Sequence, residues 1–584
     1  MLLLTGATLV VVTWTISLVA LALMGLPISA LTHDRAMSWA DVRRGLWWGM
    51  TVATIVVMLL ANLVALNSPV TLAVLASLTL AGALASVALV RRRGWAGEWK
   101  WSSSFIWVFP LAVIPTMYLA VAALGPVTNF DSGLYHLNAI AHAAEFSAIP
   151  GLANLYAPLG YANAGFPLAA ALESTPWSGD GFRLLNGLII TMVGADLVIR
   201  WGNRRRDAGD FGLLVGFVVL IVPMVALADY WVTSPSQDSA VFAGTVAASA
   251  MIMSAVSRER LWLAEMSAVG ALGISLVLLR PTMGAFLVGI LLVTLMLGVR
   301  RRVGWTKWRR WLLVVGITGV LAAVAQVVRD YLLSGWLLYP LSIVSFDVPW
   351  LASDPEGIRV PTLGYHRDPA NLWQAAEGFG WVPAWIGRLP TQWEFWLVLL
   401  LTGTAAAAVI VGRFSEAVLR LRGMLVAMVP SLLMTIIWWV ATPPSFRFAW
   451  GPVFTLVTIP LGWMLWRLVG HRAGREQRHH VTWILAAAAI PVLTVTAYSS
   501  VARLDVGAIT AERQWRAGIT LTYAVAPIPE PMTSSVGLSR GLVVEVPADT
   551  DMCWGAFPLC TPEPDGRVGY LIPTEGLVGG LSVG

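Results

Sequence analysis

Long apolar stretches recur along almost the whole of this 584-residue chain, and they constrain its fold more than any other feature. Each stretch is about 20 residues long, which is the length an α-helix needs to cross the hydrocarbon core of a bilayer. Hydrophobic residues make up 57% of the chain and charged residues only 12%, whereas soluble domains carry about 25% charged residues. One secretory signal would account for one apolar stretch, not for a series. The sequence therefore predicts an all-α, polytopic transmembrane helical bundle.

The apolar stretches predict about 14 membrane spans. They lie at 5–28, 46–66, 70–90, 104–124, 184–200, 211–229, 238–256, 261–279, 282–299, 311–328, 395–412, 424–441, 449–466 and 481–500.

Basic residues set the orientation, because they concentrate in every second connection between spans, as in Arg91–Arg93 and Arg300–Arg302. Short loops rich in Lys and Arg stay in the cytoplasm. The outer loops 126–183 and 329–394 and the tail from about 501 then lie outside the cytoplasm, as do both termini. The same rule explains the net charge of +6, so no nucleic-acid partner is expected. The partner that the composition predicts is the lipid bilayer.

We expect three regions: an N-terminal transmembrane extension at 1–103, a transmembrane core at 104–500, and an extracytoplasmic tail at 501–584. The two cysteines, Cys553 and Cys560, stand seven residues apart in a Pro/Gly-rich part of the tail. A pair so close suits a small disulfide loop, which persists only in an oxidising compartment. The alternative is two unrelated thiols.

The first outer loop begins with a carboxylate at the membrane surface. Asp131 stands in Asn129–His136 (Asn-Phe-Asp-Ser-Gly-Leu-Tyr-His), a few residues after the span 104–124. This aspartate is either a catalytic carboxylate or an N-cap, because Asp before a helical run is a common start signal. Beyond it, apolar residues at helical spacing and prolines between 150 and 167 predict short amphipathic helices at the membrane interface.

Further polar residues stand at other outer ends of spans. Asp229 and Asp238 bracket a tight turn between two spans, Arg280 opens an Arg-Pro-Thr cap, and Arg447 lies in Pro-Pro-Ser-Phe-Arg-Phe. An arginine in such a place can simply extend to lipid phosphates. Arg280 and Arg447 are nevertheless two of the few cations on a face that is otherwise depleted of them.

Other motifs carry little information. Asp549 and Asp551 have a spacing that suits a hard cation, but a solvated turn is the simpler interpretation. A divalent cation is therefore left open as a cofactor, and no metal site is assigned. We find no Walker-type phosphate loop, GxSxG elbow or zinc-ligand helix. ATP-driven pumping and serine or zinc hydrolysis thus have no support in the sequence.

Taken in order, the outer motifs resemble those of bacterial members of the GT-C glycosyltransferase superfamily, over about residues 105–562. The matching segments are Asp131 with Tyr135 and His136, Ser-Pro-Ser-x-Asp at Ser234–Asp238, Arg-Pro-Thr at Arg280–Thr282, Ser-Gly-x-x-x-Tyr-Pro at Ser334–Pro340, Pro-Pro-Ser-x-Arg-Phe at Pro443–Phe448, and Cys-Trp-x-x-x-Pro-Leu-Cys-Thr-Pro at Cys553–Pro562. Family members often place the first large loop after their first span, whereas three further spans precede it here.

The resemblance implies a sugar donor carried on polyprenyl phosphate and an acceptor that is a cell-envelope glycan or lipid, at the outer face of a bacterial plasma membrane. It implies that Asp131 is the general base that accepts the proton of the attacking hydroxyl. Arg280 and Arg447, with His136, would stabilise the departing lipid phosphate. Tyr135, Asp229 and Asp238 complete the candidate site. One carboxylate acting as base in a direct displacement predicts inversion at the anomeric carbon.

Three other functions compete with glycosyl transfer. A transporter or flippase of lipid-linked glycans would show ionisable residues near the middle of spans, and the main acidic candidate, Asp196, has Arg200 four residues away as an ion-pair partner. A transferase of the O-antigen-ligase type would favour His366 and Arg367 in the second outer loop. A scaffold role in a membrane complex is the third alternative.

Overall fold

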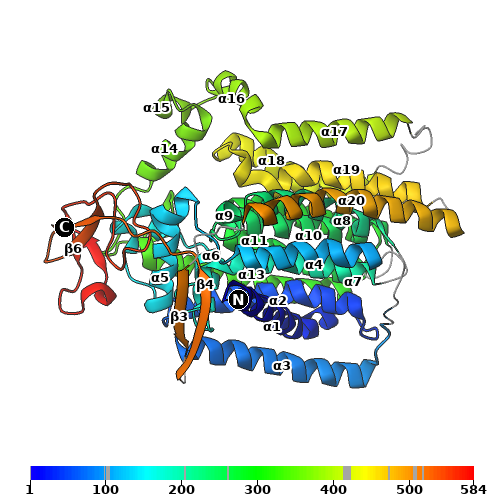
Figure 1. Cartoon of the computed structure of the whole chain (residues 1–584), viewed down its shortest axis with the longest axis horizontal. Helices are drawn as coiled ribbons and strands as arrows, with labels where there is room; N and C mark the ends of the chain where they lie inside the picture. Colours follow the sequence, from blue (N-terminus) through cyan, green and yellow to red (C-terminus); the bar gives the residue numbers. More distant parts are fainter. Residues whose placement is uncertain are drawn as a thin grey trace.

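The computed structural model describes residues 2–97, 99, 105–202, 206–258, 262–411, 422–470, 474–503, 509–515 and 518–584. Long helices run side by side along the longest axis of the molecule and form a bundle (Figure 1). The long helices are α1 (Leu2–Leu31), α2 (Trp39–Ala61), α3 (Pro69–Arg93), α4 (Phe105–Ala122), α7 (Leu185–Trp201), α8 (Ala208–Ala226), α10 (Gln237–Ser257), α11 (Trp262–Leu279), α12 (Gly284–Arg300), α13 (Trp305–Ser334), α17 (Trp393–Val411), α18 (Arg422–Ala441), α19 (Trp450–Gly470) and α20 (Gly474–Ala502).

The predicted fold class is confirmed: the chain is a multi-pass membrane protein. Within the described residues, 13 helices are long and apolar enough to cross a membrane. The remaining predicted span, 395–412, coincides with α17, whose described apolar stretch Trp393–Ala406 is shorter. The predicted spans agree with most helices to within a few residues. The larger differences are that α2 and α20 begin seven residues before the predicted spans 46–66 and 481–500, and that α13 extends six residues beyond 311–328 at both ends.

Shorter elements connect the spans and build the tail. The short helices are α5 (Leu137–Glu145), α6 (Gly165–Leu172), α9 (Ala228–Trp231), α14 (Glu356–Arg367), α15 (Leu372–Ala375) and α16 (Val382–Arg388), and the strands are β1 (Trp336–Leu338), β2 (Leu341–Ser345), β3 (Ile509–Trp515), β4 (Ile519–Val525), β5 (Thr533–Gly537), β6 (Val543–Pro547), β7 (Val568–Tyr570) and β8 (Leu581–Val583). The strands pair in sequence order into four antiparallel two-stranded sheets: β1 with β2, β3 with β4, β5 with β6, and β7 with β8.

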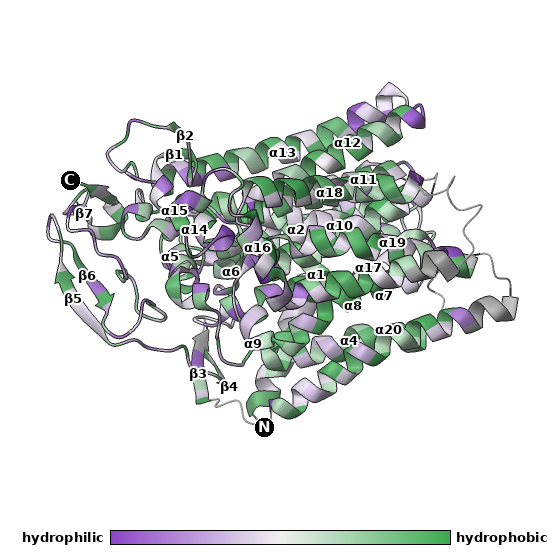
Figure 2. Ribbon diagram, turned by 90° about the horizontal axis from the view of Figure 1, so that it is seen from above, coloured by the Kyte–Doolittle hydropathy of each residue, from purple (hydrophilic) through white to green (hydrophobic). Residues whose placement is uncertain are grey.

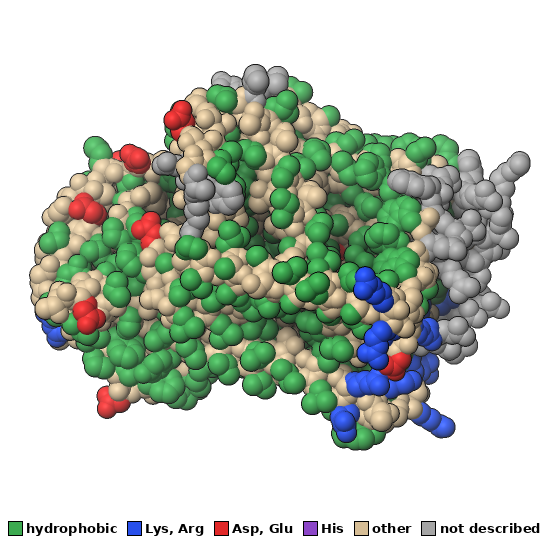
Figure 3. Space-filling model, turned by 90° about the horizontal axis from the view of Figure 1, so that it is seen from below, with side chains coloured by type: hydrophobic (Ala, Val, Ile, Leu, Met, Phe, Trp, Pro, Cys, Tyr) green, Lys and Arg blue, Asp and Glu red, His purple; other side chains and the backbone are tan. Residues whose placement is uncertain are grey.

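The two ends of the bundle differ in composition. Segments 126–183, 329–394 and 509–584 gather at one end, which we call the loop end (Figure 1). At the opposite end, which we call the basic end, helices α3 and α12 finish in Arg91–Arg93 and Arg300, and Lys and Arg side chains cluster there on the face shown in Figure 3. Apolar residues dominate the long helices between the two ends (Figure 2). This is the distribution that the predicted orientation requires.

The first two helices belong to the bundle and are packed backbone against backbone. A Cβ atom on Gly25 would lie 1.9 Å from the carbonyl oxygen of Gly45, and one on Gly49 would lie 1.8 Å from that of Leu21. Small residues allow such close approach between membrane helices. Helix α2 also packs on α11, α13 and α6. The predicted boundary between residues 103 and 104 lies outside the described residues.

Several ionisable side chains inside the spans are paired with one another towards the basic end. Asp196 accepts a hydrogen bond from Arg200 at 2.7 Å, as the spacing predicts, and another from Trp47 at 2.8 Å. Arg43 and Arg44 both donate to Glu265, at 2.5 and 2.8 Å. These contacts join α2, α7 and α11, so they brace the bundle.

The tail is held to the loop end by a buried charged cluster. Asp180 accepts hydrogen bonds from Arg183 at 3.0 Å, from Arg513 of β3 at 3.0 Å and from Tyr523 of β4 at 2.9 Å. Arg183 also donates to the carbonyl oxygen of Ala526 at 2.7 Å. The β3–β4 hairpin therefore cannot leave the loop end without breaking a network of buried hydrogen bonds.

The orientation can be tested by labelling. Thr306→Cys, at the basic end, should be protected from a membrane-impermeant thiol reagent in intact cells, whereas Gly566→Cys, in the exposed tail, should react. Cys553 and Cys560 are joined by a disulfide, so unsubstituted protein provides a control without background labelling. Labelling in the reverse sense would place the loop end in the cytoplasm.

Candidate functional site

Asp131 projects from an irregular turn at the loop end. It immediately precedes a short π-helix, Ser132–His136, which continues into α5. Single turns of π-helix are uncommon and often accompany functional sites. Asp131 occupies the N-cap position but makes no capping hydrogen bond. Its Oδ2 instead accepts a hydrogen bond from the guanidinium of Arg447 at 2.9 Å, so the capping interpretation does not account for this side chain.

A second ion pair lies beside the first. Arg280, directly after α11, binds Asp238 in the first turn of α10. The two arginines share one neighbour, Phe448: their guanidinium carbons lie 5.3 Å and 4.8 Å from the centre of its ring, and Arg280 donates to its carbonyl oxygen at 3.2 Å. Both guanidinium groups are thus bound to carboxylates.

The turn that carries Asp238 is held by hydrogen bonds to α7, to the Asp131 segment and within the turn itself. Asn186 of α7 donates to the carbonyl oxygens of Trp231, Ser234 and Ser236 at 3.1, 2.7 and 2.8 Å. The Ser236 hydroxyl donates to Asp238 at 3.0 Å. The hydroxyls of Ser132 and Ser234 lie 2.7 Å apart, which ties the Asp131 segment directly to this turn.

The two pairs differ in exposure. Asp131 and Arg447 each keep 23% of their side chain exposed, whereas Asp238 keeps 3% and Arg280 15%. The first pair is thus accessible from the surface, and the second forms a buried support behind it. The guanidinium of Arg447 also donates a hydrogen bond to the hydroxyl oxygen of Tyr230. Two cations and two carboxylates from four segments of the chain therefore meet at the loop end.

His136 and Tyr135 lie close to these charged groups. Burial lowers the pKa of His136 to about 4, so its imidazole is neutral at pH 7 and would offer a phosphate only an N–H group. Burial raises the pKa of Tyr135 well above 10, so its hydroxyl keeps its proton. The Tyr135 ring packs edge-on against Tyr161 and Phe166, with centroids 5.9 and 6.1 Å away.

From the second outer loop, His366 lies next to the residues around Arg447, but Arg367 does not. The His366 ring lies 5.2 Å from Phe448, and burial together with Arg447 lowers its pKa to about 4. Arg367 instead donates to the carbonyl oxygens of Ala375, Ala376 and Val440 at 2.8–3.2 Å. Those contacts hold α14 to the neighbouring α15 segment and to the end of α18, so Arg367 has a structural role.

Asp229 belongs to a different group. Its carboxylate pairs with Arg503 at 2.7 Å, and its backbone oxygen accepts from Thr128 at 3.2 Å. Burial raises its pKa, and Arg503 opposes that effect. The structure thus brings Asp131, Arg447, Asp238 and Arg280 together and separates Asp229 from them.

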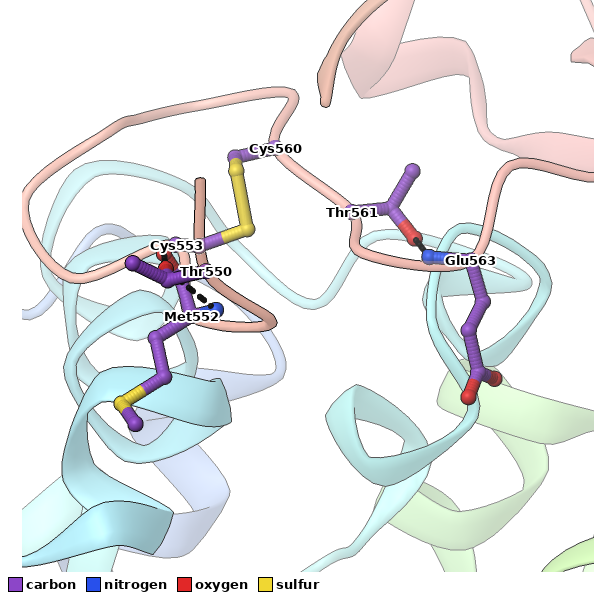
Figure 4. The surroundings of a disulfide bond; sticks show 6 residues. All are labelled: Thr550, Met552, Cys553, Cys560, Thr561 and Glu563. Carbon is purple, nitrogen blue, oxygen red and sulfur yellow. Dashed lines mark hydrogen bonds between the residues drawn. A yellow bond between two sulfur atoms is a disulfide. The ribbon is translucent and has the colours of Figure 1, made fainter. Parts of the chain in front are cut away.

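The disulfide loop of the tail covers the Asp131 segment. Cys553 and Cys560 are bonded, with their Cα atoms 5.8 Å apart (Figure 4). The adjacent Trp554 donates its backbone N–H to the carbonyl oxygen of Gly133 at 2.9 Å. A Cβ atom on Gly133 would lie 2.5 Å from the Trp554 ring, so this position requires glycine. The tail therefore fixes the position of the turn that carries Asp131.

The described residues show no group of three or more His, Cys, Asp or Glu side chains arranged to hold a metal ion. Asp549 and Asp551 are exposed in a bend of the tail. Among the described residues, no third His, Cys, Asp or Glu side chain joins Asp549 and Asp551 to form a possible metal site.

Three residues of the site escaped sequence reasoning: Asn186, Tyr230 and Trp554. Asn186 stands within a predicted span, Tyr230 in a turn, and Trp554 more than 400 residues from Gly133. For Trp554, its position beside Cys553 in a tail motif is the one feature of the sequence that could have pointed to the site.

Comparison with known proteins gives a family but no activity. A family model described as a domain of unknown function (DUF8201) matches residues 8–454. No curated protein and no solved structure matches the chain.

Proposed function

We propose that this chain, which belongs to the DUF8201 family, is a membrane glycosyltransferase of GT-C type. It moves a sugar from a polyprenyl-phosphate-linked donor to a glycan or lipid acceptor of the bacterial cell envelope. The reaction takes place at the loop end, on the extracytoplasmic face of the plasma membrane. The observation that carries the proposal is the partly exposed Asp131–Arg447 pair beside the buried Arg280–Asp238 pair.

The arginines suit the leaving group. As the bond between the anomeric carbon and the phosphate oxygen breaks, the lipid phosphate takes the electron pair and gains negative charge. A fixed guanidinium stabilises that charge more in the transition state than in the bound donor, which lowers the barrier. Arg447 is accessible, and Arg280 is held in place behind it by Asp238 and Phe448.

Asp131 suits the other half of the reaction. The acceptor hydroxyl attacks the anomeric carbon and must lose its proton, which a carboxylate within hydrogen-bond reach accepts. In the free protein Arg447 holds Asp131 at 2.9 Å. A bound phosphate competes for Arg447, and the carboxylate is then available to the incoming hydroxyl. Donor binding would in this way prepare the base.

A purely structural role fits the exposed pair poorly. Structural ion pairs of this bundle, such as Arg44–Glu265, are almost wholly buried, whereas partly exposed pairs contribute only about 0–1 kcal/mol to stability. Asp131 and Arg447 come from segments 316 residues apart. The pair is better suited to ligand binding than to bracing.

The activity can be tested with purified protein in liposomes. A sugar labelled with radioisotope on polyprenyl phosphate should appear on a glycan acceptor, with release of polyprenyl phosphate. A panel of donors and acceptors is needed because the geometry does not select the sugar. Transport of intact donor between leaflets, with no product formed, would instead identify a flippase.

A further inference from the structure

The basic end contains a large cavity that the proposed sugar transfer does not use. Its volume is about 1150 Å³, slightly above the 300–1,000 Å³ typical of small-molecule sites. The ends of α11, α12, α18 and α19 surround it, together with the α1–α2 and α12–α13 connections. The cavity is thus at the opposite end of the bundle from Asp131.

Positive charge dominates the walls. Among the described residues that line the cavity, eight are Arg or Lys, and Asp34 is the one carboxylate. The cations come from separate parts of the chain, as Arg35, Arg302 and Arg422 illustrate. Like charges that converge on one concave space repel each other and concentrate the potential there. A multiply charged anion would relieve that repulsion.

Two of the arginines are held against the walls by aromatic rings. The guanidinium carbon of Arg301 lies 5.1 Å from the Trp262 ring centre, and Arg301 also donates to the carbonyl oxygen of Ala255 at 3.0 Å. The guanidinium carbon of Arg467 lies 4.8 Å from the Trp466 ring centre. A stacked guanidinium loses less freedom when it binds a ligand, and its planar fork matches phosphate oxygens.

The orientation rule for membrane proteins does not explain this arrangement. The rule requires only that the connections on one side of the membrane carry cations. Arg91 and Arg92 at the end of α3 satisfy the rule without lining the cavity. The rule does not require cations from several connections to surround one space that tryptophans line.

We propose that this cavity binds a phosphate-bearing anion with at least two negative charges. The phosphate comes either from the head group of an anionic lipid in the adjacent leaflet or from a soluble phosphorylated compound. Both sources offer the same oxygens to the same guanidinium groups.

Binding can be measured by calorimetry on the full chain in lipid-free detergent, with inorganic pyrophosphate as the probe. The test variant is Arg302→Gln with Lys307→Gln, two exposed residues of the cavity. Arg300, Arg301, Arg309 and Arg310 remain in that segment, which preserves the orientation signal. The matched control is Arg91→Gln with Arg92→Gln. We expect pyrophosphate affinity to fall by about 10- to 100-fold in the test variant and to be unchanged in the control.

A second measurement distinguishes the two sources. Protein extracted from bilayers with and without phosphatidylglycerol is compared by native mass spectrometry, and bound lipid is competed with pyrophosphate. Retained phosphatidylglycerol that pyrophosphate displaces identifies a lipid head group, and pyrophosphate binding without retained lipid identifies a soluble ligand. Equal losses in both variants, or neither pyrophosphate nor lipid bound by wild-type protein with a normal melting profile, would overturn the proposal. Neither result depends on sugar transfer.

Discussion

Asp131→Asn should abolish most sugar transfer while the protein still folds and reaches the membrane. Asparagine keeps the size of the side chain but cannot accept a proton, and loss of a positioned base costs about 10²–10⁴-fold in rate. The stability cost should be small, because the Asp131–Arg447 pair is partly exposed and such pairs contribute about 0–1 kcal/mol. Transfer of labelled sugar and the melting temperature of the purified variant are the two measurements.

Asp229→Asn is the matched control for that experiment. Asp229 is also a partly exposed carboxylate at the loop end that pairs with an arginine, Arg503, but it is outside the group around Arg447. Near-normal transfer is expected from this control. A stable Asp131→Asn protein with near-normal transfer would contradict our assignment of the base and direct attention to Asp238.

The sequence was sufficient for the bundle because membrane helices obey local rules. Span length, apolar composition and the distribution of Lys and Arg are properties of single segments, and they located the helices α1–α4 and the loop end without tertiary information. The i,i+4 ion pair between Asp196 and Arg200 was predictable for the same reason.

The partners within the site could not be predicted in this way. Nothing local to Asp131 indicates that Arg447, 316 residues later, is its partner. The local rule favoured an N-cap for Asp131, but tertiary packing turned the carboxylate away from the helix end. Asp229 and Asp238 both stand at the outer ends of spans, so the sequence made both of them candidates for the site. Only the structure shows that Asp229 pairs with Arg503 and not with the arginines of the site.

Arg280 and Arg447 both stand at the outer ends of spans, but their contributions to stability should differ. Removing one partner of a buried ion pair costs about 3–5 kcal/mol because the other charge is left without compensation. Arg280→Ala leaves Asp238 in that state, with 3% of its side chain exposed, so this variant should melt at a lower temperature. Arg447→Ala leaves Asp131 partly hydrated, which makes it the cleaner variant for measuring catalysis.

Arg447→Ala should therefore reduce turnover by about 10- to 100-fold or more with little change in melting temperature, because a hydrogen bond to a charged group contributes about 1.5–3 kcal/mol. The loss should fall mainly on kcat, since charge on the phosphate grows as the glycosidic bond breaks. Arg447→Lys keeps the charge without the guanidinium fork and should recover part of the rate. Arg359→Ala, which disrupts an exposed ion pair with Glu356 on α14, serves as the control and should transfer sugar normally. Wild-type turnover by a stable Arg447→Ala protein would mean that Asp131 and Arg447 pair only with each other and that the donor phosphate binds elsewhere.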